Sequence, residues 1–177
     1  MGEGAGGTEL IYRTMQYLGY SWTKRLPPTD LSDAYIKHYN AKSLEDLIEG
    51  YTIGKYHIAA EAAPIVFRMA DQGDKVAQSL VQWAGTELGE MANAVIRQLD
   101  FQDVEFEVAL IGSMFKTGEA LIAPMRSKVH EIAPKAKLIP VKVKPVVGAV
   151  LLGMEAGHLP ITADNRAALN SNTKVTQ

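Results

Sequence analysis

Cysteine is absent from this 177-residue sequence, and its absence excludes several kinds of chemistry. Disulfides, thiolate zinc sites and iron–sulfur clusters all need cysteine, so this chain alone can form none of them. An excess of charge of either sign is also absent, because the formal net charge is −2. A nearly neutral chain has no basic field to attract nucleic acid, and its aromatic residues form no stacking platform for bases. No nucleic-acid partner is expected.

Long apolar runs and metal-binding histidine motifs are missing as well. No uninterrupted apolar stretch reaches the roughly 20 residues that a membrane-spanning helix needs, and the first residues lack the pattern of a signal peptide. The histidines, His38, His57, His130 and His158, do not have the H-x-x-x-H spacing of a metal site. The sequence therefore predicts a cytoplasmic protein with no membrane partner and no metal site formed by this chain.

Helical spacing dominates the first part of the chain. Apolar residues recur at this spacing from Thr8, which predicts a helix with Thr8 as its N-cap and Gly19 as its end. Two shorter helices follow. Ser43 is expected to cap the second of them, with Asp46 three residues later as in a capping box.

The centre of the chain is the most strongly helical part. Gly73 is expected to end one helix and Asp74 to cap the next, which should run for roughly 25 residues or about 38 Å. An apolar stripe follows this second helix through Ala77, Val81, Ala84, Leu88, Met91, Val95 and Leu99. A stripe of this length must pack on a broad surface, either a sheet or another long helix.

After this helix the period of the apolar residues changes to that of strands. In residues 104–111 apolar and polar residues alternate at first and all are then apolar, which predicts a strand that enters a covered sheet. A second short strand is predicted over 137–143. Helices are expected over 118–132 and 146–157. This order predicts a helix-rich α/β fold with a parallel βαβ unit and a right-handed crossover. The residues beyond His158 are polar and are expected to be loosely held.

The predicted sheet is too small for the helices around it. Two strands alone do not make a stable sheet, so the chain is interpreted as part of a larger fold. A sheet that lacks strands exposes an edge, and an exposed edge favours self-association. A homodimer is therefore expected.

The segment "GSMFK" joins the first predicted strand to the helix that follows. In a βαβ unit ligands bind beyond the carboxyl ends of the strands, and Gly112 lies at that point. A glycine lets the backbone approach a ligand, and Ser113 has a hydroxyl that can cap the helix or bond a ligand oxygen. The segment matches neither a Walker loop nor a dinucleotide fingerprint. Taken alone, these five residues favour a plain strand-to-helix turn without a ligand over a binding site.

A second glycine signal follows the second strand in "KPVVGAVLLG". Pro145 suits a helix start, and Gly148 lies in the first turn, where a side chain would obstruct close approach. Packing of the helix on a sheet is the alternative explanation. Two glycine-marked helix starts after two adjacent parallel strands would form the two sides of one crevice.

Three segments of this sequence resemble a known family. They are similar to the C-terminal half of N-acetylglucosamine kinase and its BadF/BadG/BcrA/BcrD-type ATPase relatives. The segments are "VALIGSMFKTGEALIAPM", "KPVVGAVLLGMEAGHL" and "APIVFRMADQGDKVAQSLVQWAGTELGEMANAVIRQL". This superfamily includes sugar kinases, acetate kinase, heat-shock chaperones and actin. The likeness covers most of residues 57–160 and is only loose over 8–56.

The resemblance implies a fold and a nucleotide site. Residues 1–160 would be the C-terminal nucleotide-binding portion of a two-domain sugar kinase or ATPase, an incomplete ribonuclease H-like domain, and residues 161–177 a polar tail. ATP with magnesium would bind between this domain and a second one. The implied nucleotide-binding residues are Gly112, Ser113, Met114, Lys116, Gly148 and Ala149. A lysine at a helix start is more often solvated than in contact with a ligand, so for Lys116 the solvated role is favoured over the implied nucleotide contact.

The opening "GEGAGG" resembles the family's "GDEGSG" loop, whose acidic residue contacts the sugar. This alignment assigns substrate binding to Glu3 and Gly4 and places Gly2 where the family has aspartate. The expected carboxylate is thus missing unless Glu3 replaces it, and an expression-tag remnant explains residues 1–2 equally well. The substrate implied by the resemblance is an amino sugar such as N-acetylglucosamine or glucosamine.

The family's phosphate loop and catalytic aspartate have no counterpart in this sequence. Phosphoryl transfer depends on groups that position the phosphates and stabilise their charge, so no catalytic residue is assigned and the chain alone is not expected to be a competent kinase. Two alternatives remain. One is the activating ATPase of an acyl-CoA dehydratase or reductase system. The other is a non-enzymatic helical module that dimerises through the long stripe.

Overall fold

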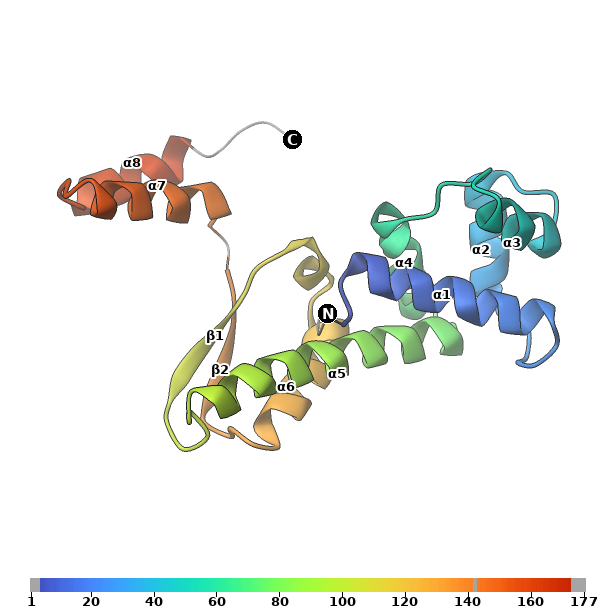
Figure 1. The fold of residues 1–177 in the computed structure, drawn as a ribbon, viewed down its shortest axis with the longest axis horizontal. Coiled ribbons are helices and arrows are strands. Elements are labelled where there is room, and N and C mark those ends of the chain that lie inside the picture. Colours follow the sequence, from blue (N-terminus) through green and yellow to red (C-terminus); the bar gives the residue numbers. More distant parts are fainter. Residues whose placement is uncertain (1–3, 142, 173–177) are drawn as a thin grey trace. The chain divides into compact units, whose positions relative to one another are not determined.

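The computed structural model describes residues 4–141 and 143–172 (Figure 1). The chain divides into two compact units. The first unit contains residues up to 108 together with 112–138, and the second contains 109–111 and the residues from 139 onward. Each unit is described by itself below.

The first unit is mainly helical. Its elements, in chain order, are α1 (Gly7–Trp22), α2 (Asp30–Tyr39), α3 (Leu44–Thr52), the short 3-10 helix η1 (Ala60–Ala62), α4 (Ala63–Asp71), α5 (Lys75–Gln98), a second 3-10 helix η2 (Ser113–Thr117) and α6 (Glu119–His130). The first predicted helix buries its expected apolar residues Leu10, Ile11, Met15 and Leu18.

The predicted ends of this first helix are wrong. Gly6 precedes α1 without a side-chain cap, so Thr8 is not the N-cap. Gly19 does not end the helix, which continues to Trp22. A glycine inside a helix lowers its stability by only about 1 kcal/mol, and the packing of neighbouring residues outweighs this amount.

The predicted caps at Ser43 and Asp74 are confirmed. The Ser43 hydroxyl accepts the backbone N–H of Asp46 at 3.1 Å. The Asp74 carboxylate accepts the N–H of Ala77 at 2.8 Å, and Gly73 before it has a φ of +97°. Asp74 also accepts the N–H of Leu31, in the first turn of α2, at 3.2 Å. One carboxylate therefore caps two helices from distant parts of the sequence.

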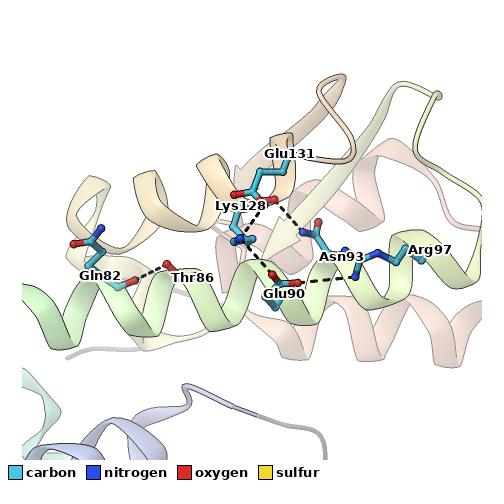
Figure 2. A network of polar contacts seen from close by, with 7 residues as sticks. All are labelled: Gln82, Thr86, Glu90, Asn93, Arg97, Lys128 and Glu131. Atoms are coloured by element: carbon cyan, nitrogen blue, oxygen red, sulfur yellow. Dashed lines mark hydrogen bonds and ion pairs between the residues drawn. The ribbon is translucent and has the colours of Figure 1, made fainter.

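Helix α5 has 24 residues, close to the predicted length, and packs along α6 (Figure 1). Two glycines let these helices approach closely. A Cβ added at Gly85 would lie 2.5 Å from the carbonyl oxygen of Leu121, and one at Gly89 would lie 2.7 Å from Cβ of Lys128. Fully buried Asn93 follows on the same face and donates from its Nδ2 to the Lys128 carbonyl at 2.9 Å (Figure 2).

Charged side chains border this helix contact. The Nζ of Lys128 lies 2.8 Å from the Glu131 carboxylate and 3.4 Å from that of Glu90 (Figure 2). Glu90 also faces Arg97 at 3.9 Å. Each of these pairs is partly exposed, and pairs of this kind contribute little to stability. The close backbone approach, rather than the charges, holds α5 on α6.

The long apolar stripe of α5 is only partly buried. Ala77, Val81 and Ala84 are buried, whereas Val95 and Leu99 are both 53% exposed. The prediction that the whole stripe packs on one surface is therefore wrong for its second half. There the helix contacts α6 through the adjacent face of Gly85, Gly89, Asn93 and Ile96, because the two glycines allow the close approach.

The strands form a two-stranded parallel sheet, as predicted. Strand β1 (Phe106–Leu110) and strand β2 (Ala136–Pro140) are each shorter than expected and lie side by side (Figure 1). In the part of the chain that the structure describes, β1 has no strand on its other edge. The sheet is thus as small as the sequence indicated.

The second unit contains two helices, α7 (Pro145–Ala156) and α8 (Ala163–Asn172). Helix α7 begins at Pro145, as expected, and is almost wholly apolar. Only Val147 of this helix is buried, while Leu152 is 67% exposed. Helix α8 lies where only a polar tail was expected. Among the described residues, no helix is both long and apolar enough to cross a membrane.

Candidate functional site

A cavity of about 660 Å³ lies in the first unit between α4 and η2. Residues of η1 and the first residue of α1 complete its wall. It lies directly after β1 along the chain, where the sequence predicts a ligand site. A volume of this size is typical of pockets that bind small molecules.

The turn η2 forms one side of the cavity. Gly112 precedes it with a φ of +135°, a conformation that residues with a side chain rarely adopt. A Cβ added there would meet only the Phe115 ring, at 4.0 Å, so the space around Gly112 is open. Met114 and Phe115 pack on the hydrophobic core and hold the turn in place.

The opposite wall comes from α4 and is largely apolar. Pro64 and Phe67 line the cavity from this helix, and Met114 faces it from η2. Phe67 is 8% exposed and belongs to the core of the first unit, so the wall is rigidly held. An apolar wall with an aromatic ring favours a flat apolar ligand group.

Charged residues of both signs surround this apolar wall. Arg68 and Lys116 are exposed and supply positive charge, whereas Glu61 and Asp71 supply negative charge. Within the described residues, neither Arg68 nor Lys116 forms an ion pair with a carboxylate. These two cations are therefore available to an anionic ligand group at the rim.

The structure brings three predicted site residues together. Ser113, Met114 and Lys116 all line the cavity, and Gly112 begins the same turn. Ser113 does not cap a helix, because η2 has no side-chain cap and α6 begins only after Gly118. The Ser113 hydroxyl is exposed.

The other predicted site residues lie elsewhere. Gly148 and Ala149 are exposed in the first turns of α7 in the second unit, and a Cβ added at Gly148 would meet no atom within 4 Å. Gly4 lies beside α5, where its N–H contacts the Met91 sulfur at 3.2 Å. Glu3 is outside the described residues.

Sequence reasoning missed the contribution of α4 to the cavity. Its apolar residues show a helical period, which predicts burial but not which residues remain next to a cavity. Arg68 interrupts this apolar run and is the signal within it that pointed to an exposed, charged position. In the described part of the chain, no cluster of three or more His, Cys, Asp or Glu side chains is placed to hold a metal ion.

Comparison with known proteins shows a distant similarity to a sugar kinase. No family model matches the chain. The chain is 22% identical over 160 residues to N-acetyl-D-glucosamine kinase of Dictyostelium discoideum. The aligned region covers 88% of this chain but 50% of that kinase, so the chain spans about half the length of the relative. The resemblance to N-acetylglucosamine kinase drawn from the sequence motifs is confirmed.

Proposed function

We propose that residues 1–160 are the ATP-binding C-terminal portion of an N-acetylglucosamine or glucosamine kinase-like phosphotransferase, an incomplete ribonuclease H-like domain. The similarity to an N-acetylglucosamine kinase over 88% of the chain supports this assignment. The parallel β1–α6–β2 arrangement, with a cavity after the first strand, agrees with a nucleotide site at that position.

The cavity suits an adenine nucleotide in both shape and chemistry. An adenine ring is flat and largely apolar, and Pro64, Phe67 and Met114 provide an apolar surface for it. The open space at Gly112 lets the nucleotide approach the backbone of the turn. Arg68 and Lys116, which have no carboxylate partner among the described residues, would meet the phosphates. This open turn beside an apolar wall is the observation that carries the proposal.

The remaining assignments rest on the sequence resemblance. Gly148 and Ala149 are proposed nucleotide contacts of the second unit, and Glu3 and Gly4 are proposed contacts to the amino sugar. Magnesium and the catalytic aspartate belong to parts of the family that have no counterpart in this sequence. We therefore propose that this chain binds ADP or ATP but does not phosphorylate a sugar by itself.

Calorimetric titration with magnesium–ADP tests the proposal. We expect saturable binding to the unaltered chain and a clear loss of affinity in Gly112→Ala, because the added methyl group forces the turn out of its positive φ. Gly54→Ala is the matched control. Gly54 also has a positive φ, +77°, and open surroundings, but it lies outside the cavity.

Two results would overturn the proposal. The first is the absence of saturable ADP binding to the unaltered chain. The second is equal loss of affinity in Gly112→Ala and Gly54→Ala, which would attribute the loss to general strain. Lys116→Gln should weaken ADP more than adenosine, because the lysine is assigned to the phosphates.

A further inference from the structure

A second cavity, of about 670 Å³, lies where α1 ends and the loop toward α2 begins (Figure 1). It belongs to the first unit and shares no lining residue with the cavity between α4 and η2. Its lining residues are Ser21, Trp22, Lys24, Arg25, Leu26, Pro27, Pro28 and Leu44. Two of these residues are cationic and none is acidic, so the cavity carries positive charge.

Backbone hydrogen bonds fix the loop that carries the two cations. The N–H of Lys24 donates to the Ser21 carbonyl at 3.0 Å. The N–H of Arg25 donates to the Tyr20 carbonyl at 2.9 Å, which completes a Schellman motif at the end of α1. Lys24 occupies the left-handed position of this motif, with a φ of +59°, where glycine is usual. The two cationic side chains thus start from an ordered backbone, which lowers the entropy cost of binding a ligand.

The Arg25 side chain is also held in place. Its guanidinium carbon lies over the Tyr20 ring, 4.1 Å from the ring centroid. Stacking uses the face of the planar guanidinium and leaves the N–H groups at its edge, which suit two oxygens of one anion. In the part of the chain that the structure describes, neither Arg25 nor Lys24 forms an ion pair with a carboxylate.

The rest of the cavity wall is apolar and includes an aromatic ring. Trp22 is 40% exposed, so part of a large indole ring faces solvent beside the two cations. Leu26, Pro27 and Pro28 extend this apolar surface. An indole next to aliphatic side chains favours a flat aromatic group, and a cavity of this volume is typical of small-molecule sites.

We propose that this cavity binds a small phosphate monoester of an aromatic alcohol, with its phosphate on Lys24 and Arg25 and its ring against Trp22. A phosphate monoester carries about −1.5 to −2 charges at pH 7, which two unpaired cations match better than they match a single carboxylate. The site lies outside the cavity assigned to ADP. This inference therefore does not rest on nucleotide binding, and either proposal can fail without the other.

Calorimetric titration of the complete chain with phenyl phosphate tests this site. We expect saturable binding that is about tenfold or more tighter than the binding of phenol or of inorganic phosphate, because each of those probes lacks one of the two contacts. The absence of saturable binding would overturn the proposal. Equal affinity for phenyl phosphate and inorganic phosphate would also overturn it, because the ring would then contribute nothing.

Two substitutions remove the cations one at a time. Lys24→Gly keeps the left-handed turn, which glycine adopts readily, and Arg25→Gln keeps a side chain of similar length. Each should raise the dissociation constant for phenyl phosphate about fivefold or more. Arg13→Gln is the matched control, because Arg13 also stacks on an aromatic ring, that of Trp83 at 4.7 Å, but lies outside the cavity. Its affinity should equal that of the unaltered chain.

Cations at a helix C-terminus also stabilise the helix through its dipole. Unchanged affinity in both Lys24→Gly and Arg25→Gln would leave the two residues with that role alone and overturn the proposal. Circular dichroism checks that the variants stay folded.

Tryptophan fluorescence tests where the ring binds. The chain has two tryptophans, so in Trp83→Phe the emission comes from Trp22 alone. Phenyl phosphate should change this emission with the dissociation constant that calorimetry gives, and an emission unchanged at saturation would contradict the contact with Trp22. Gly112→Ala should bind phenyl phosphate like the unaltered chain. A loss of affinity in that variant would place the ligand in the cavity after β1 and overturn the proposal.

Discussion

The two halves of α5 have similar apolar sequences but different surroundings. In the first half, Ala77, Val81 and Ala84 belong to the core that α5 shares with α1 and α4. In the second half, Val95 and Leu99 continue the same stripe and are half exposed, while the neighbouring face packs on α6. The comparison teaches that a helical stripe predicts an apolar face and not the element that covers it.

Truncation of equivalent leucines at the two ends of α5 gives the largest expected contrast. Leu80→Ala removes a side chain that is 2% exposed and should lower the free energy of unfolding by about 2–5 kcal/mol. Leu99→Ala should change it by less than about 1 kcal/mol, because the Leu99 side chain is already half exposed. Urea unfolding measures both. Equal losses would show that the second half of α5 is as well covered as the first.

The α5–α6 contact can be broken at its closest approach. Gly85→Ala should lower the free energy of unfolding by about 1–3 kcal/mol, because its methyl group would lie 2.5 Å from a backbone oxygen that cannot easily move. Gly19→Ala is the matched control in α1, where an added Cβ meets nothing within 4 Å. It should be neutral or stabilising. A destabilised Gly19→Ala together with a neutral Gly85→Ala would contradict the close packing.

The junction of α2 and α5 predicts a pH dependence. Burial acts to raise the pKa of Asp74, but hydrogen bonds from Thr29 and from the N–H groups of Ala77 and Leu31 outweigh it and lower the pKa. A lowered pKa in the folded state stabilises the fold above the unfolded pKa of about 3.9, and this contribution is lost as the pH falls through the folded pKa.

Asp74→Asn tests this dependence. The variant should be less stable by about 1 kcal/mol at neutral pH, and its difference from the unaltered chain should shrink in acid. Thermal unfolding between neutral and acidic pH measures the change, with Asp33→Asn as an exposed control in α2. A stability difference that stays constant down to strongly acidic pH would contradict the assigned role of the carboxylate.

Local chemistry made some features predictable from the sequence. The caps at Ser43 and Asp74 were predictable because each uses a side chain and an N–H three residues away. The helix α5 and the parallel strand pair followed from the period of the apolar residues. The end of α1 was not predictable in this way, because packing beyond Gly19 outweighs the low helix propensity of one glycine.

The sequence by itself determined the types of most elements before residue 158, the small sheet, the bare turn at Gly112 and the likeness to half of a sugar kinase, but not helix α8. Only the tertiary structure decided that α4 faces η2 across a cavity, so that Phe67 and Arg68 join Ser113 and Lys116. It also decided that Val95 and Leu99 remain exposed. The physical reason is that local patterns record which residues avoid water, whereas the choice among possible neighbours depends on close approach between segments far apart in the chain.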